Sequence, residues 1–202
     1  MKLKSFALAL AAVAGLAISG STASAQVGQG CRSIVLPNGT VLTCTLGPGG
    51  TKVYVDALGN SFPATSTGTG SFTVTNTGTN PCQATLTPAA ININSNAGPF
   101  GTVVTTLDAT RPVTPSLIIS QAIASEFPAT EDFYFHANAT VSSLPGRQFQ
   151  TIQQFHFSSR NVRSFNPHKQ ERFAQIDKVD FEDVNAPGVV VFSVQGTQIT
   201  LN

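Results

Sequence analysis

The chain has 202 residues, and only 10% of them are Asp, Glu, Lys or Arg, against about a quarter in an ordinary soluble domain. Eleven basic and ten acidic residues give a formal net charge of +1, so no strong field would attract a nucleic acid or an anionic membrane surface. With 41% hydrophobic residues, 17 Gly and 12 Pro, the composition excludes a disordered chain and indicates a folded protein rich in turns.

The first 25 residues have the pattern of a secretory signal peptide. Lys2 and Lys4 form a positively charged start, residues 6–18 are mainly apolar, and Ala23-Ser24-Ala25 fits a cleavage site. The apolar run is shorter than the ~20 residues of a membrane-spanning helix, and no later segment predicts a span in the mature chain. We therefore expect a bacterial protein that is secreted or periplasmic after cleavage of residues 1–25.

Three cysteines follow this segment: Cys31, Cys44 and Cys82. An oxidising compartment favours disulfides, and the sequence allows either a Cys31–Cys44 or a Cys44–Cys82 bridge. Pro37-Asn38-Gly39 predicts a hairpin turn between the first two cysteines, and its register leaves Cys31 one residue out of line with Cys44. We expect the remaining thiol to be buried and inert, with self-association through an unpaired Cys as the alternative.

The charge-poor first part of the mature chain, residues 26–100, predicts a series of short strands. Only Arg32, Lys52 and Asp56 are charged there, and the alternation in Phe72-Thr73-Val74-Thr75 is typical of a half-buried strand. The run 72–79 resembles, over eight residues, a stretch of immunoglobulin-like modules in secreted bacterial proteins. The strands expected here cover residues 33–36, 40–46, 52–57, 71–76 and 84–94.

The charge-rich second part, residues 101–202, begins with one ambiguous element. Ile119, Ile123 and Phe127 repeat at a spacing of four before Pro128, which predicts a short helix over residues 116–126. A buried strand through Leu117-Ile118-Ile119 is the alternative. The strand signals that follow cover residues 132–141, 148–158 and 175–184, and then the arms 189–194 and 197–201 of a terminal hairpin around Gln195-Gly196.

Together these elements predict an all-β fold, an antiparallel immunoglobulin-like β-sandwich with at most one short helix near residues 115–126. We expect residues 26–202 to form one domain, with a possible subdivision into residues 26–100 and 101–202.

The sequence holds no motif of a common enzyme class: no nucleophile elbow, no zinc-binding His-Glu-x-x-His helix, and no nucleotide-binding loop. The glycine-rich run 67–71 is expected to be a turn, since it leads into a strand rather than a helix. Glu126, Glu131 and Asp132 are candidate glycosidase carboxylates in name only, because the chain has no Trp and only two Tyr to stack on sugars.

One constellation in the second part could bind a metal. If the strands around residues 143–147 form a hairpin that pairs residue 136 with residue 156, His136 and His156 face each other, and Asp132 or Glu131 could supply an oxygen ligand. The competing interpretation places both histidines on the solvent face of a sheet. Alternation then directs four phenylalanines to the other face: Phe133, Phe135, Phe155 and Phe157.

A basic cluster between residues 159 and 173 is a candidate anion-binding loop, formed by Arg160, Arg163, Lys169 and Arg172 together with His168. In the alternative these side chains form a solvated loop that pairs with the acidic strand after it. The leading hypothesis is a secreted, non-catalytic structural, surface or ligand-binding module without a cofactor. An extracellular hydrolase with a metal or carboxylate site at Asp132, His136 and His156 is the alternative.

Overall fold

The computed structural model describes residues 37–75, 83–120, 127–164 and 171–201. These residues form a 12-stranded antiparallel sheet, and the one helical element among them is a short 3-10 turn, Gly98–Phe100. The prediction of an all-β fold is therefore confirmed. The strands are β1 (Val41–Asp56), β2 (Ser61–Thr75), β3 (Gln83–Asn96), β4 (Thr102–Leu107), β5 (Ser116–Ser120), β6 (Ala129–Phe135), β7 (Ala137–Val141), β8 (Gln148–Thr151), β9 (Phe155–Val162), β10 (Glu171–Gln175), β11 (Val179–Asp183) and β12 (Ala186–Leu201).

The strands make one continuous meander. β4 and β5 both pair with β3, at different places along it and in the same direction, so together they act as one long strand. β6 and β7 follow one another end to end in the same way, as do β8 and β9, and β10 and β11. Counted so, the sheet has eight long strands, each pairing with the next along the chain. β1 pairs with β12 as well as with β2, which closes the sheet.

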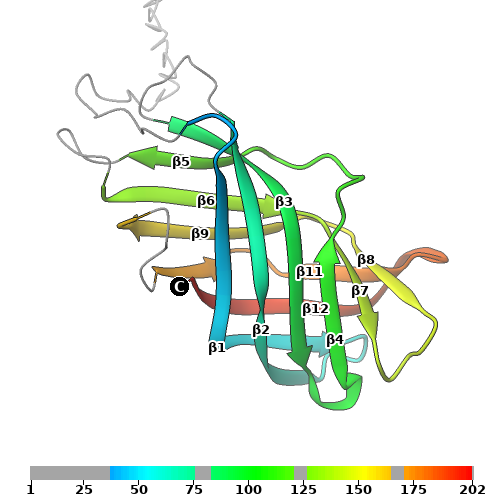
Figure 1. Ribbon diagram of the computed structural model, residues 1–202. Helices are drawn as coiled ribbons and strands as arrows, with labels where there is room; N and C mark the ends of the chain where they lie inside the picture. Colours follow the sequence, from blue (N-terminus) through cyan, green and yellow to red (C-terminus); the bar gives the residue numbers. More distant parts are fainter. Residues whose placement is uncertain (1–36, 76–82, 121–126, 165–170, 202) are drawn as a thin grey trace, which may run out of the picture.

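The closed sheet is flattened into two layers. Figure 1 shows β1, β2, β3 and β4 crossing in front of β5, β6, β9 and β12. Packing of two layers is compatible with a sandwich-like fold, but the immunoglobulin-like form is not confirmed. The pairings β1–β12 and β3–β5 join the two layers through backbone hydrogen bonds, because long twisted strands curl the sheet until its edges meet.

Several predicted elements are longer than the sequence indicated. The strands expected at 40–46 and 52–57 belong to one strand, β1, whose pairing with β2 shifts register between Leu46 and Gly50. The turn before β1 is confirmed, since the Thr40 amide donates to the Pro37 carbonyl at 3.0 Å and Gly39 has a φ of 85°.

Cys44 lies in β1 opposite Gly70. The segment 33–36, Cys31 and Cys82 lie outside the described residues, as do both candidate disulfides.

The helix expected over 116–126 is wrong in its first part, where residues 116–120 form β5; residues 121–126 lie outside the described part. The buried-strand alternative is confirmed, with Ile118 fully buried between β3 and β6. β-branched Ile side chains favour the extended backbone, and pairing on both edges outweighs the helical spacing. The run 67–71 is likewise part of β2 rather than a turn.

The terminal hairpin is also wrong. Residues 186–201 form one long strand, β12, and Gln195-Gly196 is a bulge within it. Pairing with β1 moves from Gln195 opposite Val53 to Gln198 opposite Thr51, and Gly196 takes a φ of 62°. A glycine in the left-handed region accommodates such a bulge as readily as a hairpin turn, so the local sequence does not distinguish the two.

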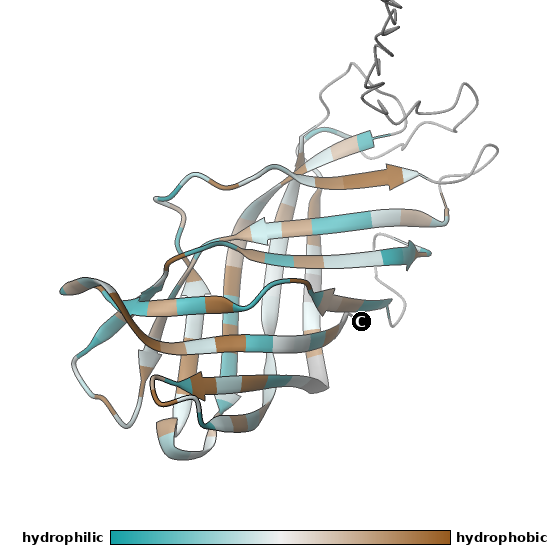
Figure 2. Cartoon of the chain, turned by 180° about the vertical axis from the view of Figure 1, so that it is seen from behind, coloured by the Kyte–Doolittle hydropathy of each residue, from teal (hydrophilic) through white to brown (hydrophobic). Residues whose placement is uncertain are grey.

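The core lies between the two layers. Figure 2 shows hydrophobic and hydrophilic residues alternating along the strands, as expected where one face of a sheet is buried. Strands from both the charge-poor and the charge-rich part contribute to one hydrophobic cluster, which includes Leu42, Tyr54, Phe72, Phe133, Phe149, Phe173, Phe181 and Phe192. No helix in the described ranges is long and apolar enough to span a membrane.

Candidate functional site

The two histidines of the predicted metal site do not face each other. β6 pairs with β9 so that Tyr134, rather than His136, lies opposite His156. The shift by two residues leaves His156 and Asp132 on the same face of the sheet. Alternation correctly predicted that His156 points outward and that Phe133, Phe135, Phe155 and Phe157 are buried on the opposite face. It was wrong for His136, which was expected on the solvent face but is buried.

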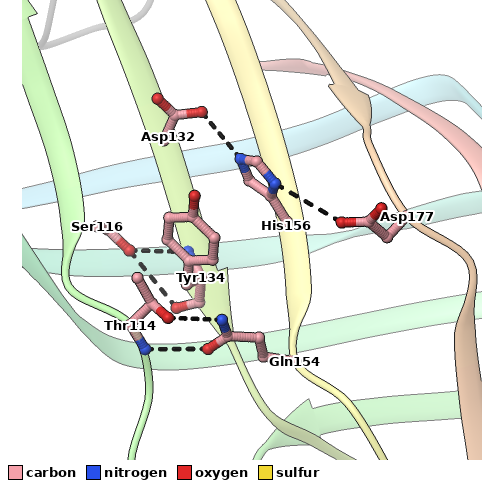
Figure 3. Close-up of polar contacts among 7 residues, drawn as sticks. All are labelled: Thr114, Ser116, Asp132, Tyr134, Gln154, His156 and Asp177. Carbon is pink, nitrogen blue, oxygen red and sulfur yellow. Dashed lines mark hydrogen bonds and ion pairs between the residues drawn. The ribbon is translucent and has the colours of Figure 1, made fainter. Parts of the chain in front are cut away.

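His156 lies between two carboxylates on the outer face, as Figure 3 shows. Its Nε2 is 3.0 Å from Asp132 Oδ1, and its Nδ1 is 3.9 Å from Asp177 Oδ2. The Tyr134 ring stacks on the imidazole with a centroid separation of 4.3 Å. Burial, followed by the charges of Asp132 and Asp177, raises the pKa of Tyr134. A partly buried imidazole thus lies between two carboxylates and stacks on a tyrosine ring.

Hydrogen bonds beside His156 hold the neighbouring strands in position, but they add no reactive group to this site. The Ser116 hydroxyl accepts a 2.8 Å hydrogen bond from the Tyr134 amide. Thr114 and Gln154 form a reciprocal pair, in which the Thr114 amide donates to Gln154 Oε1 and Gln154 Nε2 donates to Thr114 Oγ1. These contacts tie the chain before β5 to the outer face of β6 and β9.

His136 lies at the break between β6 and β7 and is buried. Its Nδ1 is 3.0 Å from the Thr151 hydroxyl, which also accepts a hydrogen bond from the Ala137 amide. Burial, and then the nearby Arg111, lowers the pKa of His136, while Asp108 acts in the opposite direction. These contacts make His136 a neutral structural link where the strands are interrupted.

The other predicted site residues are Glu131 and the basic cluster. Among the described residues no three His, Cys, Asp or Glu side chains come together as a metal site, and Glu131 is fully buried on the face opposite to Asp132. Arg160 in β9 and Arg172 in β10 are exposed, and so is Arg163. The Arg163 backbone amide donates to Glu171 Oε1 at 2.6 Å. Lys169, His168 and Glu126 lie outside the described residues.

Two acids of the following segment have partners other than the basic cluster. Asp183 binds Arg147 at 2.6 Å, and Asp180 lies 3.0 Å from Lys178. The amide of Asn185 and the Arg147 guanidinium lower the pKa of Asp183.

A cavity between the two layers was not indicated by any sequence motif. The enclosed part is small, about 40 Å³, and it opens into about 600 Å³ of space between atoms that includes solvent. Side chains of β1, β2, β3, β4, β6, β9 and β12 line it. The apolar lining includes Phe72, Phe133, Phe135, Phe155, Phe157, Leu46, Ile91, Ile93, Val194 and Ile199, and the polar lining consists of Lys52, Ser66, Thr69, Thr105 and Thr197.

Among the described residues, Lys52 is the only charged one that lines this cavity. Its side chain is 6% exposed, and its Nζ lies 5.1 Å from the centre of the Tyr54 ring. Burial lowers the pKa of Lys52 to about 7. The same burial raises the pKa of Tyr54 to about 12, against smaller effects of the Ser95 and Thr105 hydroxyls. An amine that titrates near neutrality therefore faces an aromatic cavity.

The sequence matches no family model and no curated protein. Among solved structures, the chain is similar to DynF from the dynemicin biosynthesis pathway of Micromonospora chersina. The TM-score is 0.68 and the sequence identity 10%, over 87% of this chain and 90% of that chain. At this identity the likeness concerns the fold alone, and it extends over nearly the whole of both chains.

Proposed function

We propose that this chain is an exported, non-catalytic binding protein that holds a small, largely apolar ligand inside the closed sheet. The observation that carries the proposal is the cavity between the layers, where five phenylalanines surround space that side chains leave unfilled. Ligand sites are typically concave and mostly apolar, with a few polar groups that fix orientation. The interior cavity has this composition, with one amine and four hydroxyl side chains among its lining residues.

The contacts of His156 on the outer face favour a binding protein over a hydrolase. A catalytic histidine needs one ring nitrogen for an orienting acid and the other for a nucleophile or water, whereas both ring nitrogens of His156 face carboxylates. Asp132, His136 and His156 are also absent from the lining of the interior cavity. Their contacts support a structural role in the sheet.

Binding is tested by titrating the purified protein with the neutral fluorophore N-phenyl-1-naphthylamine, whose emission rises in apolar surroundings. We expect saturable binding of one molecule per chain. Val194→Phe, which fills the cavity, should weaken the affinity at least tenfold, because Val194 lines it. The matched control is Val190→Phe, at a residue of the same strand that is 38% exposed. Equal affinities of the two folded variants, or no saturation, would contradict the proposal.

Export is proposed on the pattern of residues 1–25: a charged start, an apolar segment and small residues before Gln26. Expression in a bacterium with the complete sequence, followed by intact-mass measurement, tests it. The expected product begins at Gln26 and is found outside the cytoplasm. Full-length protein retained in the cytoplasm would contradict export while leaving the binding proposal unaffected.

A further inference from the structure

Lys52 is an unusual residue to find in an aromatic cavity. It belongs to β1, opposite Ala64 of β2, and the alternation of buried residues directs it inward together with Tyr54. Within the described part of the chain, no carboxylate lies within ion-pair distance of its Nζ. Three glutamates of the described residues are buried, Glu131, Glu171 and Glu182, and none of them lines the cavity.

A buried ammonium without a counter-charge is costly, because the interior replaces little of the hydration that the charge loses. The contact with the Tyr54 ring offsets part of this cost. A pKa lowered to about 7 reflects the rest. An anion placed beside the amine would reverse this effect, since an opposite charge a few ångströms away favours the protonated form.

The surroundings of the amine restrict the kind of anion. Ser66 and Thr105 line the same cavity, so hydroxyl groups are available for oxygen atoms of the ligand. The rest of the lining is mainly aromatic and aliphatic, which suits a hydrocarbon chain or ring system. A small anion such as phosphate would leave this apolar surface uncovered.

We infer that Lys52 binds the carboxylate of an amphipathic carboxylic acid, whose apolar part fills the phenylalanine-lined cavity. This inference rests on the proposed function and names its ligand class. Lys52 supplies charge selection, and the phenylalanines supply most of the apolar contact. Tyr54, which contacts Lys52, has its pKa raised to about 12 and stays neutral in the physiological range. Lys52 is therefore the group of this pair whose charge changes.

The test compares decanoic acid with decan-1-ol, which have the same chain length, by isothermal titration of the full protein. At pH 6.5 we expect the acid to bind at least tenfold more tightly than the alcohol, because the acid is ionised and Lys52 is protonated. Lys52→Met should abolish this preference while retaining affinity for the alcohol. Lys52→Arg should retain the preference. Lys178→Met, at an exposed lysine paired with Asp180, is the control and should behave as the wild type.

A second measurement needs no variant. Between pH 6.5 and pH 9 the affinity of the wild type for the acid should fall at least tenfold, because free Lys52 loses its proton, whereas the affinity for the alcohol should stay constant. Equal affinities for acid and alcohol, or an acid preference that survives in Lys52→Met, would overturn the inference and leave the binding proposal standing. If neither compound binds, the proposed function itself fails.

Discussion

Lys52 and His156 show two ways in which this sheet holds a basic side chain beside an aromatic ring. Lys52 faces the interior beside Tyr54, and the described residues that line the cavity include no acid. His156 lies on the outer face, stacks on Tyr134 and has a carboxylate near each ring nitrogen. The outer side chain, His156, therefore has its polar partners within the protein. The inner side chain, Lys52, has no such partner among the described residues that line the cavity. A charge without a partner in a cavity is the stronger indication of a ligand.

The largest difference between the two faces should appear at adjacent residues of β6. Phe133 stacks on Phe72 and Phe173 at centroid separations of 4.6 and 4.7 Å, so Phe133→Ala should lower the free energy of unfolding by about 3–5 kcal/mol. Tyr134→Ala removes only the outer stacking on His156, and about 1 kcal/mol is expected. Urea denaturation measures both. A larger loss for Tyr134→Ala would show that the outer face is the one that holds the strands.

Lys52→Met should have the next largest effect, in the stabilising direction. In the unfolded chain Lys52 keeps its proton to about pH 10, but in the folded protein it loses the proton near pH 7. Below pH 7 the cost of the buried charge is fully present. Between pH 7 and pH 10 the unfolded state binds more protons, so stability rises with pH by up to about 1.4 kcal/mol per pH unit.

The variant has no such charge, so it should be more stable by about 2–4 kcal/mol at pH 7 and should show a weaker dependence on pH. Urea denaturation from pH 6 to pH 10 measures both quantities. Lys178→Met is the matched control, because Lys178 is exposed and paired with Asp180. An identical pH dependence of wild type and Lys52→Met would show that Lys52 is not a buried charge.

The smallest effects are expected at the outer pair. Asp132→Asn and His156→Ala each remove a partly exposed contact of 3.0 Å, and such pairs contribute at most about 1 kcal/mol. Neither substitution should change the affinity for N-phenyl-1-naphthylamine. A thermal melt combined with the fluorophore titration checks both points. A loss of binding in His156→Ala without a loss of folding would remove the distinction between the two faces.

Local patterns predicted much of the sheet from the sequence. Alternation in Phe72-Thr73-Val74-Thr75 placed Phe72 and Val74 inside, and the same rule directed Asp132 and His156 outward. The rule fails in β1, where Val53 and Val55 suggest a buried face but Lys52 and Tyr54 are the buried residues. The register of the pairing between β1 and β2 shifts between Leu46 and Gly50. This shift lies within the strand and cannot be recognised from the pattern of hydrophobic residues.

Closure of the sheet could not be predicted, because it depends on pairs between distant residues. The register between strands could not be predicted either. β6 and β9 pair Tyr134 with His156, which is two residues away from the pairing of His136 with His156. Gly68 gives a local example. A Cβ there would meet the Asn92 carbonyl oxygen at 2.2 Å, so the glycine that suggested a turn is required by the close approach of β3.

The seam between β1 and β12 has a consequence for how the chain reaches this structure. Tyr54 pairs with Val194, at the opposite end of the sequence. Because the amino-terminal part is synthesised first, one edge of β1 stays unpaired until the last strand has followed. Open edges recruit strands of other molecules, and contacts between distant residues form slowly. The interval before the seam closes is therefore the period in which this protein is most exposed to aggregation.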